Sequence, residues 1–251
     1  MYNFASETAS DAYLKALEDV WFEPQFKSSP RGMACREIMN YTFTVKNPDD
    51  SPIITQDLER NKVIESYTAK EVQLYNSMTN RVEDFAKASK FWNKLANPDG
   101  TVNSAYGYLI WGNKSCGHPV FKTEDNKLPE FVTPWDWAKN SLIKDKDSRQ
   151  AVMRFSLPEH QFPGNKDQTC TMHGNWLIRD DKLHLTVIMR SNDLMLGLVY
   201  DLPWFCSLMD RMVEELKYDY PDLTKGEYTH QSHSMHIYER DEAAIMRMLG
   251  E

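Results

Sequence analysis

The sequence predicts one large α/β domain spanning residues 1–251. Apolar side chains recur at helical spacing in residues 6–20 and 57–77, whereas in residues 176–189 they recur at every second position. A chain of 251 residues is long enough to bury a sizeable core. We find no internal repeat and no linker in the sequence, so a single domain is expected.

The first two helices are expected over residues 6–20 and 57–77. Thr8 or Ser10 is placed to cap the first turn of the first helix. The apolar side of the second helix is predicted to comprise Val63, Ile64, Tyr67, Val72 and Tyr75. Glu71 lies near that side, and on residue type alone its carboxylate is expected to extend to solvent.

The remaining elements follow from shorter patterns. We expect strands over 38–45, 151–155 and 234–238, helices over 134–143 and 201–217, and a polar loop over 218–229. In residues 176–189 a polar turn at Arg179-Asp180-Asp181-Lys182 separates two alternating stretches, which predicts a β-hairpin.

Composition excludes several classes of function. Acidic residues outnumber basic ones by 37 to 29, and the formal charge of −8 gives no support to direct nucleic-acid binding. The cysteines at positions 35, 116, 170 and 206 are too widely spaced for a zinc motif or a secreted disulfide framework, so a reducing cytoplasm is expected. We identify no membrane-spanning run and no secretion signal.

The most informative stretch runs from Thr169 to Asp201. Cys170 precedes the first strand of the predicted hairpin, and Arg190 ends the second. These two ends open on the same side of a hairpin, so the thiol and the guanidinium can face one ligand. A lone cysteine is more often a small buried apolar residue, and the surrounding pattern must therefore decide between the two interpretations.

This stretch resembles the thymidylate synthase family, and within it the pyrimidine nucleotide hydroxymethylases. The family shows a nucleophilic cysteine, a hairpin, Arg-Ser-x-Asp, and a Gly-Leu segment that ends in Asn or Asp. The matching residues are Cys170, Arg190, Ser191, Asn192, Asp193, Gly197 and Asp201. Weaker similarity extends from about Arg31 to Tyr238. The resemblance implies an α+β fold with a large mixed β-sheet flanked by helices, and a sheet face used for dimerisation.

The chemistry implied by the resemblance suits a thiol. C5 of a pyrimidine is a poor nucleophile, but addition of the Cys170 thiolate at C6 makes C5 enamine-like. C5 then attacks the one-carbon unit of 5,10-methylenetetrahydrofolate. Arg190 is expected to lower the pKa of the thiol as well as to bind phosphate, and Glu71 is implied to face the nucleotide and order water.

Asp201 carries the expectation about the base. An Asn amide matches O4 and N3–H of uracil, whereas a carboxyl group accepts the N4 amino proton of cytosine and holds a proton on N3. By this resemblance, family members that act on uracil have Asn at this position, and those that act on cytosine have Asp. Cytosine is therefore favoured, with the alternative that Asp201 is only the N-cap of the helix that follows.

The resemblance also implies the contacts to phosphate and sugar. These nucleotide contacts are Arg31, Arg190, Ser191, Asn192, His236 and Tyr238. In a homodimer the partner's Arg149 is expected to reach the phosphate, while Gln150 replaces a second arginine of the family and removes its charge.

The expected folate contacts are Trp92, Tyr106, Asp193 and Gly197. Trp92 and Tyr106 have an equally good interpretation as core aromatic residues. Leu95 stands where thymidylate synthases usually show a second Trp, which alters part of the folate-side wall.

The product depends on whether water or hydride meets the exocyclic methylene. Thr171 replaces the His that follows the nucleophile in the synthases, and the sequence ends at Glu251 without their long closing segment. Both features favour water. The expected function is 5-hydroxymethylation of dCMP, as in enzymes that bacteriophages use to make modified DNA precursors.

Several alternatives are kept. The first two are hydroxymethylation of CMP for a nucleoside antibiotic and methylation of dCMP or dUMP. The third is a regulatory nucleotide-binding protein, against which the retention of Cys170, Glu71 and Asp193 argues. The last is a metal module on His230, His233 and His236, whose spacing in a strand separates the side chains onto different faces, so no metal is expected.

Overall fold

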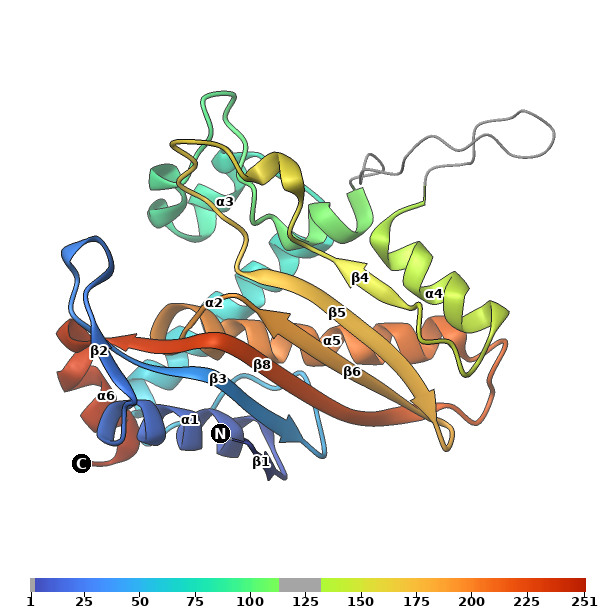
Figure 1. Ribbon diagram of the computed structural model, residues 1–251, viewed down its shortest axis with the longest axis horizontal. Coiled ribbons are helices and arrows are strands. Elements are labelled where there is room, and N and C mark those ends of the chain that lie inside the picture. The colour runs from blue at the N-terminus through green and yellow to red at the C-terminus, as the bar shows by residue number, and fades with distance from the viewer. Residues whose placement is uncertain (1–2, 113–131) are drawn as a thin grey trace.

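The computed structural model describes residues 3–112 and 132–251 (Figure 1). Their eight strands form one mixed sheet in the order β1-β3-β8-β6-β5-β4, with β2 paired to β3 and β7 to β8. The strands are β1 (Asn3–Ser6), β2 (Phe26–Ser28), β3 (Cys35–Val45), β4 (Val152–Arg154), β5 (Thr171–Arg179), β6 (Lys182–Met189), β7 (Asn192–Asp193) and β8 (Thr224–Tyr238). The expected α/β fold with a large mixed sheet is confirmed.

The helices pack around this sheet, and Figure 1 shows α2 and α5 behind its strands. They are α1 (Ala9–Phe22), α2 (Leu58–Asn76), α3 (Val82–Ala88), α4 (Pro134–Lys144), α5 (Val199–Leu216) and α6 (Glu242–Leu249). The short helical turns are η1 (Pro30–Gly32), η2 (Lys90–Lys94), η3 (Tyr108–Gly112), η4 (Pro158–His160), η5 (Leu194–Leu198) and η6 (Glu239–Asp241).

Side-chain caps fix where the first two long helices begin. Thr8 Oγ1 accepts the N–H of Asp11 at 3.1 Å, and Asp57 Oδ1 accepts the N–H of Arg60 at 3.0 Å. Each cap satisfies a backbone donor that has no partner inside its own helix. The sequence therefore places both helix starts correctly to within a few residues.

Strands β5 and β6 form the predicted hairpin. Its turn residues Asp180 and Asp181 have φ values of 49° and 54°, the left-handed conformation that a two-residue turn with the twist of the strands requires. Trp176 on β5 and Leu185 on β6 are fully buried, as are the residues two positions further along each strand. The alternating pattern thus fixes which face of the hairpin meets the core.

Strand β8 differs most from the expectation. The polar loop expected over 218–229 is wrong, because β8 already begins at Thr224 and continues to Tyr238. Its inward residues include Tyr228 and His230, both fully buried, while its outward residues are polar and half-buried or exposed. Polar side chains on both faces therefore conceal the alternation that identifies a strand.

Helix α2 also corrects two expectations. Val63 is 52% exposed, whereas Glu71 is 8% exposed, so the carboxyl group occupies a place on the buried side and does not extend to solvent. Strand β1 and helices α3 and α6 were not predicted. None of the helices in residues 3–112 and 132–251 is long and apolar enough to cross a membrane.

Candidate active site

Cys170 and Arg190 meet at the open end of the hairpin. Cys170 immediately precedes β5 and Arg190 immediately follows β6, and the Arg190 N–H donates to the Cys170 carbonyl at 2.9 Å. The guanidinium donates to the carbonyls of Thr169 and Gln168 at 3.1 and 2.6 Å, and its Nη2 lies 3.6 Å from Cys170 Sγ. The backbone thus holds the guanidinium beside the thiol, as the hairpin pattern predicts.

Cys170 is half-buried and packs against the edge of the hydrophobic core. Desolvation by the surrounding protein raises the pKa of the Cys170 thiol to about 11, Arg190 lowers it, and Asp201 raises it further. Arg190 therefore acts in the expected direction without outweighing desolvation. Additional positive charge at this end of the hairpin would favour the thiolate.

Asp201 is a buried carboxyl group, 8% exposed, in the first turn of α5. The helix begins at Val199, so the alternative in which Asp201 is only an N-cap is wrong. Asn192 Nδ2 donates to Asp201 Oδ2 at 3.3 Å. Burial raises the pKa of Asp201 to about 7, whereas the hydrogen bond from Asn192 lowers it. The group therefore titrates near neutral pH.

Glu71 is the second buried carboxyl group of the site. Tyr67 Oη donates to Glu71 Oε1 at 3.3 Å, and Trp92 Nε1 donates to Tyr67 Oη at 3.2 Å. Burial raises the pKa of Glu71 to about 8, and the charge of Asp201 adds to that shift. Two buried carboxyl groups with pKa values raised to near neutral pH are characteristic of acid–base sites.

Asp193 and Gly197 shape the turn that leads into α5. Asp193 Oδ1 accepts the N–H groups of Met195 and Leu196 at 2.7 and 3.2 Å, which starts η5. A Cβ atom on Gly197 would lie 2.6 Å from Asn192 Oδ1. Only glycine permits this approach, so Gly197 has a packing role next to the predicted nucleotide residues.

The predicted sugar residues lie together at the end of β8. Ser191 Oγ is 3.3 Å from His236 Nδ1, and the rings of His236 and Tyr238 meet edge to face with centroids 5.5 Å apart. Asp193 pairs with His236 in the parallel register of β7 and β8. The pairing places these side chains beside the segment that follows Arg190.

Tyr106 joins the aromatic core to the nucleophile segment. Its hydroxyl accepts the N–H of Thr171 at 3.4 Å, while its ring packs against Trp204 and Phe155 with centroids 5.5 and 5.3 Å away. Tyr106 is therefore both a core aromatic residue and a neighbour of Cys170, so the two interpretations of this residue are compatible.

Two predicted phosphate residues lie on other segments. Arg31 is exposed in η1, with a φ of 53°, and Arg149 is exposed between α4 and β4. Of the arginines predicted to bind the phosphate, Arg190 is the one that the hairpin supplies. A phosphate site of several arginines thus depends on segments outside the hairpin.

The three histidines of β8 do not converge. His230 is fully buried, whereas His233 is exposed. In residues 3–112 and 132–251 no group of three or more His, Cys, Asp and Glu side chains is arranged to hold a metal ion.

Sequence reasoning missed the roles of Tyr67 and His230. Tyr67 lies one helical turn before Glu71, so its spacing was an available signal. His230 offered no such signal, because the buried positions of β8 pass from even to odd residue numbers between Ser232 and Met235, so its spacing from His236 does not identify its face.

The fold and the site define an enzyme of one-carbon transfer. The chain belongs to the thymidylate synthase family, because the family model described as "Thymidylate synthase" matches residues 11–250.

Individual relatives refine this picture. A protein of Enterobacteria phage T6 described as "Deoxycytidylate 5-hydroxymethyltransferase" is 29% identical over 225 residues, covering 87% of this chain and 81% of that protein. A "Thymidylate synthase" of Fusobacterium nucleatum is 27% identical, covering 82% and 67% of the two chains. The structure of thermostable thymidylate synthase A from Bacillus subtilis matches with a TM-score of 0.70 at 18% identity, covering 96% and 84%, and supports the shared fold.

Proposed function

We propose that this protein hydroxymethylates C5 of deoxycytidylate. The reaction converts dCMP, 5,10-methylenetetrahydrofolate and water into 5-hydroxymethyl-dCMP and tetrahydrofolate. The observation that carries this proposal is Asp201, a buried carboxyl group whose pKa is raised to about 7. Its position in the family's Asn-or-Asp place and the similarity to the phage T6 protein support the same substrate.

Cytosine complements a carboxyl group that shares one proton. N3 of cytosine accepts a hydrogen bond and N4 donates one, so a protonated carboxyl group satisfies both atoms. Uracil presents the reverse pattern, with N3–H as donor and O4 as acceptor. A pKa of about 7 for Asp201 allows the proton to lie between Asp201 and N3, where it activates the ring for attack at C6.

The covalent step uses Cys170. Its thiolate forms a bond to C6, and the electron pair of the C5–C6 double bond becomes available at C5, which then bonds to the one-carbon unit of the folate. Loss of the C5 proton breaks the bond between the one-carbon unit and the folate nitrogen, which keeps the electron pair and leaves as tetrahydrofolate, so an exocyclic methylene remains on C5. Water adds to this methylene as the hydroxyl group, and cleavage of the C6–S bond releases Cys170 and restores the aromatic ring. Because the thiol pKa is about 11 even with Arg190 beside it, formation of the thiolate calls for further positive charge, such as the other arginines assigned to the phosphate.

Glu71 and Thr171 support the choice of water. Glu71 is buried and titrates near pKa 8, so it can take or return a proton to an ordered water molecule. The Oγ1 atom of Thr171, next to the nucleophile, is buried without a hydrogen-bond partner among the described residues. A polar atom of this kind requires a water molecule or a substrate group to satisfy it.

The remaining residues are assigned to binding. The phosphate is bound by Arg31, Arg190 and Ser191 together with the partner's Arg149. The sugar is contacted by His236 and Tyr238, and Asn192 faces the base. The residues beside the one-carbon donor are Trp92, Tyr106, Asp193 and Gly197. The donor set fits a pterin, because Asp193 Oδ1 serves its own helix and its second oxygen is left to accept ring N–H groups.

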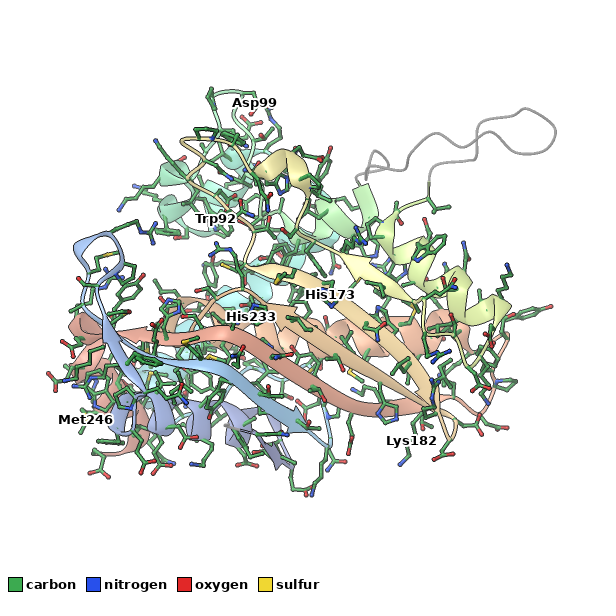
Figure 2. The ribbon with its side chains drawn as sticks, in the orientation of Figure 1. Trp92, Asp99, His173, Lys182, His233 and Met246 are labelled. Atoms are coloured by element: carbon green, nitrogen blue, oxygen red, sulfur yellow. The ribbon has the colours of Figure 1, made fainter. Side chains whose placement is uncertain are left out.

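The assembly proposed is a homodimer through the sheet face that no helix covers in Figure 1. Figure 2 labels His173 on β5 and His233 on β8 in this face. Asn175 lies two residues after His173 on β5. Its buried Oδ1 atom has no hydrogen-bond partner among the described residues, and a second subunit can supply one. Mixing Arg149→Ala with Cys170→Ala subunits should restore turnover that neither variant has, whereas an inactive mixture argues against a shared site.

The decisive experiment is product identification by mass spectrometry after incubation with 5,10-methylenetetrahydrofolate and dCMP, CMP or dUMP. A hydroxymethyl product from dCMP supports the proposal. A methyl product supports the thymidylate synthase alternative, for which the Fusobacterium relative is the main argument. Hydroxymethyl-CMP as the sole product moves the substrate to the ribonucleotide, and nucleotide binding without any product indicates a regulatory protein.

A further inference from the structure

His230 is a buried histidine that the proposed chemistry does not use. It is fully buried in β8, with its ring stacked on Phe43 at a centroid distance of 5.1 Å. Its Nδ1 lies 2.8 Å from Tyr228 Oη, and its Nε2 lies 3.5 Å from Asn192 Nδ2. Tyr228, His230, Asn192 and Asp201 thus form a continuous polar chain through the core.

The tautomer of His230 follows from its neighbours. Burial lowers the pKa of His230 to about 3, so the ring is neutral and carries one proton. Asn192 Nδ2 faces Nε2 as a donor, so Nε2 accepts and the ring proton resides on Nδ1, where it donates to Tyr228 Oη. The Tyr228 hydroxyl, which can accept a hydrogen bond, is a suitable partner for the tautomer that leaves Nε2 free to accept.

The orientation of the Asn192 amide follows in turn. Its nitrogen has acceptors in Asp201 Oδ2 at 3.3 Å and His230 Nε2 at 3.5 Å, with Met189 Sδ at 2.7 Å as a third, weaker one. Its Oδ1 is buried without a hydrogen-bond partner among the described residues and faces the Gly197 backbone. The acceptors on the nitrogen side therefore select this orientation, since the oxygen side offers nothing.

We propose that His230 is a positioning residue for base recognition, which holds the Asn192 amide so that it donates to Asp201. This inference rests on the function proposed above. If the amide turned over, Oδ1 would face the Asp201 carboxyl group and would favour its protonated form. His230 thereby controls how readily Asp201 shares its proton with a base.

The surroundings of Asp201 make this one hydrogen bond important. The other ionisable groups that interact with Asp201 are Glu71 of α2, Asp193 of β7, Cys170 ahead of β5, and the phenols of Tyr75, Tyr106 and Tyr228. All are acids, so none of them stabilises the carboxylate by opposite charge. The donor from Asn192 is the contact that opposes burial.

The test is the titration of Asp201 in the free enzyme, followed by carbon-13 NMR of labelled aspartate carboxyl groups, with Asp201→Asn identifying the signal. His230→Phe keeps an aromatic ring on Phe43 and removes the acceptor. It should raise the pKa of Asp201 above the value of about 7. Because a protonated Asp201 complements cytosine, the raised pKa should also increase the ratio of dCMP to dUMP affinity several fold when it is measured at pH 8.

Three further variants keep the test decisive. Tyr228→Phe removes one hydroxyl group and should move both measurements in the same direction. His230→Gln supplies a carbonyl acceptor and should restore them partly. Phe43→Leu removes the stacking partner but leaves both ring nitrogens, so it should lower stability without moving the Asp201 titration.

The outcomes separate this inference from the proposed function. An unchanged Asp201 titration in folded His230→Phe and Tyr228→Phe proteins overturns the positioning role, whatever the product of the reaction. A shifted titration in a protein that yields no hydroxymethyl product from dCMP supports the positioning role and overturns the proposed function.

Discussion

Arg190 Nη2 lies 3.6 Å from Cys170 Sγ, on a guanidinium that two backbone carbonyls hold in place. The positive charge favours the thiolate. We therefore expect Arg190→Gln to raise the pKa of Cys170 above about 11. Alkylation by iodoacetamide, followed by mass spectrometry from pH 7 to pH 10, should become slower at every pH. Arg179→Gln, at the opposite end of the hairpin, is the matched control, and equal rates in the two variants would contradict the prediction.

Replacement of the nucleophile should separate chemistry from binding. Cys170→Ala is expected to abolish product formation while the affinity for dCMP, measured by calorimetry, stays within a few fold, because phosphate and base contacts remain. Cys206→Ala removes a thiol that is fully buried in α5 and should retain turnover per folded molecule. Product formation by Cys170→Ala would show that no covalent adduct is needed.

Asp201→Asn should move the base preference towards uracil. The amide donates to O4 and accepts from N3–H, the reverse of what cytosine presents, so discrimination should change by about 1–3 kcal/mol. Affinities for dCMP and dUMP measured on the same preparation check this. Asp210→Asn, an exposed site on the same helix, should leave the ratio unchanged. A ratio unaffected by Asp201→Asn would remove the argument for cytosine.

Gly197→Ala tests the close approach of η5 to Asn192. The added Cβ would lie 2.6 Å from Asn192 Oδ1, so the amide or the turn must shift. Overpacking of this kind lowers the free energy of unfolding by about 1–3 kcal/mol, measured in urea. We expect kcat/KM to fall as well, because Asn192 is displaced from Asp201. Leu196→Ala, which truncates a side chain that is 56% exposed, should change neither quantity appreciably.

The buried carboxyl groups make stability fall as the pH rises. The pKa of Glu71 is about 8 in the folded chain against an ordinary value of 4.5. Between these values the folded state holds a proton that the unfolded state has released, so the free energy of unfolding decreases by about 1.4 kcal/mol per pH unit.

Glu71→Gln should reduce this slope without abolishing it, because Asp201 contributes with the same sign between 3.8 and about 7. Urea unfolding at several pH values between 5 and 8 provides the measurement. Glu59→Gln replaces an exposed carboxylate on the same helix and should leave the slope as it is. A slope that Glu71→Gln does not alter would mean that Glu71 is ionised in the folded protein.

Much of the fold and the central part of the site could be predicted from the sequence. The hairpin and the positions of Cys170 and Arg190 at its ends follow from local alternation and turn residues, which act over a few positions. Helix α2, expected over residues 57–77 from its apolar spacing, spans Leu58–Asn76 with Asp57 as its N-cap.

Long-range packing decided the rest. The burial of Glu71 depends on α5 and on Tyr67, and the path of β8 through residues 224–229 depends on pairing with β3 and β6 on its two sides. Neither is expressed as a local pattern, because the residues concerned are polar. The relationship of His230 to Asn192 joins segments 38 positions apart and was beyond any local rule.

Strand β8 pairs with β3, β6 and β7 and alternates buried side chains with outward ones, and its buried positions pass from even to odd residue numbers between Ser232 and Met235. Because side chains alternate with a period of two, inserting or deleting one residue in its middle would exchange the two sets for the remainder of the strand. His236 and Tyr238 would then leave the nucleotide side. Length changes should therefore be tolerated before Thr224, in the connection from α5, and be lethal to function between Tyr228 and Met235.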